Sequence, residues 1–106
     1  MIIRDKIVYV YDIEVFPNVF HCTVKNTETG ELHKFEISER KKDLLAIRIF
    51  FEDPDKMFCG YNNHHYDDPI INYILDHRHI MMVKSIWEIC GSIFNLSRTI
   101  TTSENT

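Results

Sequence analysis

The chain has 106 residues, which is enough for one compact domain and too few for two. Hydrophobic residues make up 44% of it and charged residues 26%, a balance typical of globular rather than disordered chains. The formal net charge of −4 argues against a strongly basic surface for nucleic acid, although a bound divalent metal would reverse the sign of an acidic site locally.

The cysteines and the hydropathy indicate where the protein works. Cys22, Cys59 and Cys90 are odd in number and include no Cys-x-x-Cys pair, so a disulfide framework is not expected. The sequence has no apolar stretch of membrane-spanning length and no signal peptide. We therefore expect a soluble cytoplasmic protein without a membrane partner.

The first part of the chain predicts three strands. Residues 6–14 are rich in Val, Ile and Tyr and predict a buried strand, whereas residues 19–25 alternate and predict a half-buried one. Residues 26–31 have the composition of a hairpin turn, and residues 32–37 return as a third strand.

Helices and a further strand follow. Ser38 is a candidate N-cap for a helix over residues 39–52. Residues 56–61 predict a short strand, and Asp67 begins a second helix with Pro69 in its first turn, where proline is tolerated.

The last predicted helix opens with a capping box. Ser85 and Glu88 have the required spacing, and the apolar pattern continues to Leu96. We assign residues 1–98 to one domain and residues 99–106 to a polar tail. The order of elements predicts an α/β fold, with a mixed sheet flanked by helices.

Two acidic signatures suggest a metal site. The first is Asp12-Ile13-Glu14, where Asp12 and Glu14 share one face of a strand; the second is residues 60–69, which read GYNNHHYDDP. Carboxylates suit Mg²⁺ or Mn²⁺, and two-metal phosphodiester hydrolysis places two such ions about 3.5–4 Å apart. Asp12 would bridge both ions, Glu14 would hold the first and Asp67 the second. The alternative is that these acids merely flank strand ends.

The two signatures resemble the first and second motifs of the DEDD-type 3′→5′ exonucleases. The closest resemblance is to the proofreading domain of family B DNA polymerases, especially phage ones, through residues 9–14 and through Asn62 with Tyr66 and Asp67. The resemblance implies a ribonuclease-H-like fold and metal-dependent removal of nucleotides from the 3′ end of single-stranded DNA. A phage-encoded chain would work in the cytoplasm of the host cell.

The same resemblance implies three substrate contacts. Asn62 and Tyr66 would contact the terminal nucleotides, and Phe16 would stack on a base. The alternatives are that Phe16 and Tyr66 pack in the core and that Asn62 is only a turn residue.

The third motif of the family is absent. It would supply a fourth carboxylate well downstream of the second motif, but no aspartate follows Asp76. The chain therefore resembles the N-terminal part of such a domain, with an incomplete sheet, and we expect weak or no activity unless a second polypeptide completes the site. A non-catalytic module that binds DNA or a replication protein, and self-association over the unfinished sheet, are the alternatives.

Two other groups of residues suggest competing sites. Cys59, His64, His65, His77 and His79 could bind zinc, but they lack the paired, regular spacing of zinc ligands. Residues 40–42 could contact phosphate, although such clusters are more often the solvated face of a helix.

Overall fold

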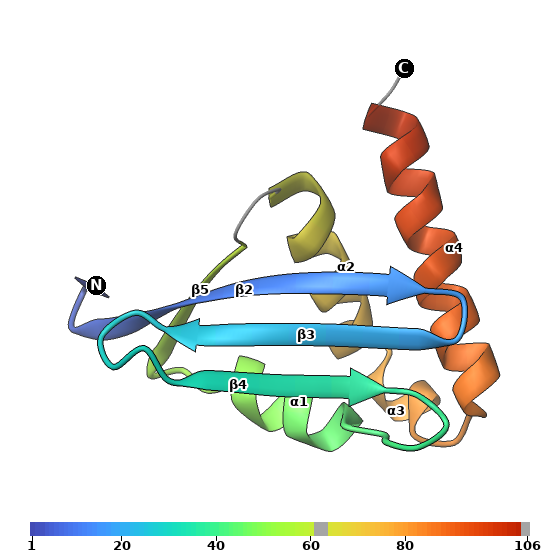
Figure 1. Cartoon of the computed structure of the whole chain (residues 1–106), viewed down its shortest axis with the longest axis horizontal. Coiled ribbons are helices and arrows are strands. Elements are labelled where there is room, and N and C mark those ends of the chain that lie inside the picture. Colours follow the sequence, from blue (N-terminus) through green and yellow to red (C-terminus); the bar gives the residue numbers. More distant parts are fainter. Residues whose placement is uncertain (61–63, 105–106) are drawn as a thin grey trace.

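The computed structural model describes residues 1–60 and 64–104, and it describes their side chains except those of 64–68, 78 and 101–104. Figure 1 shows a sheet with helices gathered on one side of it. The strands are β1 (Ile2–Ile3), β2 (Lys6–Phe16), β3 (Val19–Asn26), β4 (Leu32–Ile37) and β5 (Lys56–Gly60), and the helices are α1 (Leu44–Phe51), α2 (His64–Asp76), α3 (Arg78–Met81) and α4 (Ile86–Glu104).

The sheet is mixed. Strands β1, β2, β3 and β4 pair in that order, each antiparallel to the next, and β5 pairs with β2 in parallel. Strand β2 therefore lies between β3 and β5, and the connection from β4 to β5 passes through α1. The predicted α/β class, with a mixed sheet and packed helices, is confirmed.

One face of the sheet forms the core. Alternate residues of β2, beginning with Tyr9, point to this face, and the helices bury their apolar sides against it. In Figure 1 the four helices of the described chain lie behind the sheet, so they leave its near face uncovered. The fully buried side chains include Phe20, Cys22, Val24, Ile37, Ile47, Ile70, Ile74, Ile89, Cys90 and Ile93.

An aromatic cluster holds α1 and β5 against β2. The rings of Phe51 and Phe58 stack with centroids 4.6 Å apart, and Tyr11 meets Phe51 edge-on at 5.4 Å. Tyr9 meets Phe50 in the same edge-on manner at 5.4 Å. Each such pair contributes about 0.5–1.5 kcal/mol beyond the area that it buries. The cluster therefore fixes the two elements beside the acidic strand.

Helix α1 begins later than predicted. Ser38 does not cap it, because the Ser38 hydroxyl donates to Glu36 and the backbone at residues 38–42 still bonds with the end of β4. The N–H of Asp43 donates to the carbonyl of Glu36 at 2.9 Å, and helical bonding starts with the Asp43 carbonyl, which accepts from the N–H of Ile47 at 2.8 Å. The prediction of a helix from residue 39 is wrong for this reason.

Strand β2 is longer than predicted. It reaches Phe16, which pairs with Val19, so only Pro17 and Asn18 form the turn to β3. Helix α2, which contains part of the second signature, begins at His64 rather than at the predicted Asp67, and Pro69 lies within it.

Helix α4 has the predicted capping box. The N–H of Glu88 donates to the Ser85 hydroxyl at 3.2 Å, and the N–H of Ser85 donates to the Glu88 carboxylate at 3.3 Å. The helix continues to Glu104, across the boundary at residue 98. The Ser97 and Thr99 hydroxyls donate to carbonyls one turn earlier in the helix, at 2.7 and 3.0 Å, so these polar groups are hydrogen-bonded within α4.

None of the helices in residues 1–60 and 64–104 is both long enough and apolar enough to cross a membrane.

Candidate functional site

The uncovered side of the sheet, here named the open face, carries both acids of the first signature. Asp12 and Glu14 are exposed there, while Tyr11 and Ile13 between them are buried in the core. The members of this face follow from strand alternation and register. They include Val8, Val10, Asp12, Glu14 and Phe16 of β2, Val19, His21, Thr23 and Lys25 of β3, Leu32, Lys34 and Glu36 of β4, and Met57 and Cys59 of β5.

Asp12 and Glu14 differ from the other acid of the open face in having no partner. Within the described part of the chain, neither carboxylate accepts a hydrogen bond or forms an ion pair. Glu36, by contrast, is buried and accepts two hydrogen bonds from Arg40, at 2.8 and 2.9 Å. Asp12 and Glu14 therefore keep all their oxygen lone pairs available for a cation.

The partners of Glu36 exclude it from such a role. Its pKa is lowered from 4.5 to about 2, first by the Arg40 hydrogen bonds and then by the Ser38 hydroxyl. His21 lies 3.9 Å away on the neighbouring strand. This carboxylate is thus a structural anchor for the bend that follows β4.

The parallel pairing of β2 and β5 places the start of the second signature beside the first. Tyr11 pairs with Gly60, the last residue of β5, so the chain leaves β5 beside the position of Asp12. Strand β2 runs on to Phe16, so Asp12 and Glu14 lie on the part of β2 that extends beyond β5. Asn62 lies outside the described residues. Tyr66 and Asp67 belong to the first turns of α2, but their side chains are also outside the described part.

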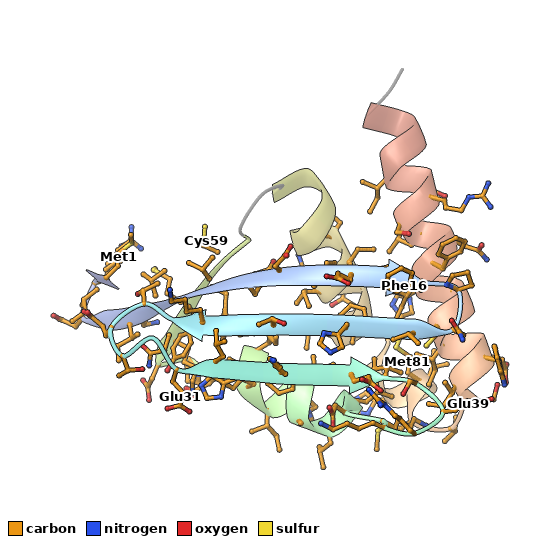
Figure 2. The ribbon with its side chains drawn as sticks, viewed as in Figure 1. Met1, Phe16, Glu31, Glu39, Cys59 and Met81 are labelled. Carbon is orange, nitrogen blue, oxygen red and sulfur yellow. The ribbon has the colours of Figure 1, made fainter. Side chains whose placement is uncertain are left out.

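Phe16 shares the open face with both acids. It stands at the carboxyl end of β2, as Figure 2 shows, and its side chain is 50% exposed. Core packing, the alternative weighed for this residue, is therefore wrong. An exposed ring two residues beyond Glu14 is available to stack on a flat group.

A hollow on the open face adjoins Asp12. It has a volume of about 590 Å³ and is lined by Val10, Tyr11, Asp12, Thr23, Lys25 and Thr27. Sites for small ligands have volumes of roughly 300–1,000 Å³, so a nucleotide-sized group would fit. The sequence pattern already placed Thr23 and Lys25 on one face of their strand. Their position beside Asp12 depends on strand register, which the pattern does not give.

The described residues hold two of the three proposed metal ligands. Among them, no three His, Cys, Asp or Glu side chains form a group that could hold a metal ion. Asp12 and Glu14 lie two residues apart on one strand face, roughly 6–7 Å along the strand. Oxygen donors at this spacing fit Mg²⁺ or Mn²⁺ if Asp67 supplies a third carboxylate.

The competing sites are not assembled in the described part of the structure. Cys59 lies on β5, whereas His77 hydrogen-bonds to the end of α2, with its Nδ1 2.8 Å from the Tyr73 carbonyl oxygen. The side chains of His64 and His65 lie outside the described residues.

The basic cluster at residues 40–42 has structural partners. Arg40 binds Glu36, Lys41 lies 3.3 Å from the Asp43 carboxylate, and Lys42 donates to two backbone carbonyls near the start of α4. These residues precede α1, so the interpretation of them as a solvated helix face is wrong, and their contacts leave little for phosphate.

Comparisons with protein-family models, with curated proteins and with solved structures found no match to this chain.

Proposed function

We propose that this chain is a divalent-metal-dependent 3′→5′ exonuclease-like domain that acts on single-stranded DNA ends, similar to the proofreading domain of phage family B polymerases. Asp12, Glu14 and Asp67 would be the ligands of Mg²⁺ or Mn²⁺. Asn62, Tyr66 and Phe16 would hold the terminal nucleotides.

One observation carries the proposal. Asp12 and Glu14 are exposed on the same face of β2, and neither has a partner within the described residues. Two neighbouring carboxylates repel each other, and a cation between them would relieve that repulsion. The register of β2 with β5 adds support, because Tyr11 opposite Gly60 places the start of the second signature beside the strand that carries the first.

The mixed sheet is compatible with a ribonuclease-H-like arrangement. The acidic strand β2 pairs with the parallel β5 as far as Tyr11 and with β3 along its acidic part, where Asp12 faces Thr23 and Glu14 faces His21. A paired strand gives a ligand pair a rigid support, which suits metal binding better than a loop does.

A bound metal pair would activate a water molecule and stabilise the leaving oxygen of the phosphodiester. The chain's own residues would bind the ions and orient the DNA end. Within these 106 residues no aspartate follows Asp76, so the fourth carboxylate that the resemblance implies, and the side chain that would orient the attacking water, are not among them. We therefore propose weak activity or none in isolation, with a second polypeptide or a second copy as the completing partner.

Manganese titration followed by thermal unfolding tests the metal site. A ligand at 100 times its dissociation constant stabilises the native state by about 2.7 kcal/mol. Wild-type protein should gain stability with Mn²⁺, and Asp12→Ala should lose that gain. Glu39→Gln is the matched control, since Glu39 is an exposed acid outside the proposed site. An equal Mn²⁺ response in wild type and Asp12→Ala would contradict the proposal.

Digestion of single-stranded DNA with Mn²⁺ tests the activity. We expect slow or undetectable hydrolysis by the isolated chain. Rapid hydrolysis that disappears in Asp12→Ala would show that the fourth carboxylate is dispensable, and so contradict the proposed weakness.

The second candidate is a non-catalytic module that keeps the fold and binds DNA or a replication protein. The uncovered sheet face, with Phe16 and Lys25 exposed on it, would serve such binding as well. DNA binding without any Mn²⁺ response would support this candidate over the exonuclease.

A further inference from the structure

Lys25 lies beside Asp12 in the hollow of the open face. Thr23 on β3 pairs directly with Asp12, and Lys25 pairs with Val10, so Lys25 is the diagonal neighbour of Asp12. Diagonal neighbours on antiparallel strands are roughly 7–8 Å apart, within reach of a long side chain. Both residues line the hollow of about 590 Å³.

Two hydrogen-bond donors of the hollow, on Lys25 and Thr23, lack partners as the acids do. Within the described chain, neither the Lys25 ammonium nor the Thr23 hydroxyl makes a hydrogen bond or ion pair. Lys34, which pairs with Thr23 on the next strand, is exposed and is likewise unpaired among the described residues. The row from Asp12 across the sheet thus passes from a carboxylate to a hydroxyl and then to an ammonium.

This arrangement suits an anion that approaches an acidic site. The chain has a net charge of −4, and two free carboxylates on β2 would repel a phosphate backbone. Lys25 on β3 and Lys34 on β4 offset that repulsion, and both lie on the β3 side of the acids. A polyanion bound there would extend from Asp12 across β3 toward β4.

We propose that Thr23, Lys25 and Lys34 contact the phosphates of the single strand whose 3′ end lies at Asp12 and Glu14. This inference rests on the proposed function and gives the strand a direction across the sheet. The contacts are to phosphate, so they position the strand without reading its sequence. Val10 supplies an apolar floor between the cationic and acidic sides of the hollow.

The alternative is that Lys25 only stabilises the folded protein and does not contact DNA. Opposite charges on neighbouring strands attract each other, and Lys25 could pair with Asp12 in solution. Such a pair would affect unfolding but would not contribute counterion release when DNA binds.

The salt dependence of DNA binding separates these roles. The affinity of 5′-fluorescein oligothymidylate is measured by anisotropy in EDTA over a range of salt concentrations. Each lost phosphate contact lowers the slope of log K against log salt by about 0.7 for single strands. Lys25→Gln should lower the slope by that amount, Lys25→Gln with Lys34→Gln by about twice as much, and Lys25→Arg should keep the wild-type slope.

Lys84→Gln is the matched control. It makes the same charge change on the helix side, where Lys84 lies 3.9 Å from Glu88. Equal slopes for Lys25→Gln and Lys84→Gln, or no measurable binding by wild type, would overturn the proposal. Loss of thermal stability in Lys25→Gln without a change in slope would also overturn it, and would leave Lys25 a structural partner.

The experiment is independent of the metal site. EDTA removes divalent ions, so a slope change in Lys25→Gln stands even if Mn²⁺ fails to bind. Conversely, Mn²⁺ binding with an unchanged slope would refute the phosphate contacts alone.

Discussion

Tyr11 of β2 pairs with Gly60 of β5 in a parallel register, and this pairing places the first residue of the second acidic signature beside the strand that carries the first. The residue after Tyr11 is Asp12, exposed on the open face. The chain that follows Gly60 leads within a few residues to α2 and Asp67. A single strand pair thus brings Gly60 next to the residue that precedes Asp12.

Asp67 and Asp68 give the sharpest test of the second signature. Asp67→Asn should abolish the stabilisation by Mn²⁺, because it removes the proposed third carboxylate. Asp68→Asn makes the same change one residue later and should retain the stabilisation. Thermal unfolding with and without Mn²⁺ measures both; an equal response from the two variants would contradict the assignment of Asp67.

Phe16 should matter for DNA and not for folding. Its side chain is 50% exposed, so Phe16→Ala should change stability little. Loss of base stacking should weaken oligothymidylate binding by about 1–3 kcal/mol. Trp87→Ala is the control, since Trp87 is a 57% exposed aromatic residue at the start of α4. Anisotropy titrations that give the two variants the same affinity would remove Phe16 from the site.

Glu36 makes stability depend on pH. Its folded pKa of about 2 lies below the ordinary 4.5, chiefly because Arg40 hydrogen-bonds the charged form. The contribution of this group is therefore complete above pH 4.5 and is lost as the pH falls toward about 2. Urea unfolding across this range should show a shallower loss in Arg40→Gln than in wild type. Arg48→Gln, a charge change on α1, should behave as wild type.

The capping box should be worth a measurable part of the stability. Ser85→Ala removes the acceptor for the Glu88 N–H and should lower the free energy of unfolding by about 0.5–2 kcal/mol. Ser92→Ala, inside the same helix, should change it by less than about 0.5 kcal/mol, because alanine is the better helix former. Urea denaturation compares the two; equal effects would mean that the cap is not formed.

Ile47 and Ile49 test which side of α1 faces the core. Ile47 is fully buried, and Ile47→Ala should cost about 2–5 kcal/mol because it leaves a cavity. Ile49 is 65% exposed, and Ile49→Ala should change the free energy of unfolding by no more than about 0.5 kcal/mol. A reversed order in urea denaturation would contradict the packing of α1.

Local patterns were sufficient for several features. Alternation in residues 19–25 predicted the two sides of β3, and the spacing of Ser85 and Glu88 predicted the start of α4. The period of two along β2 put Asp12 and Glu14 on one face. These features depend on neighbours in sequence, so a single chain segment contains the information.

Contacts between distant segments decided the rest. Ser38 is a residue type that often caps helices. Its hydroxyl instead donates to the Glu36 carboxylate at the end of β4, and α1 begins only at Leu44. Arg40 belongs to a basic cluster that could contact phosphate, but its guanidinium donates to the Glu36 carboxylate instead.

The sequence by itself determined strands β2 to β5, the presence of helices α2 and α4 and the shared face of Asp12 and Glu14, because backbone periodicity and capping are local. Only the tertiary structure decided that the helices leave this face uncovered, that the acids have no partner in the described chain, and that Lys25 lies beside Asp12. Strand register and helix packing are fixed by burial across the whole sheet, and no single segment contains that information.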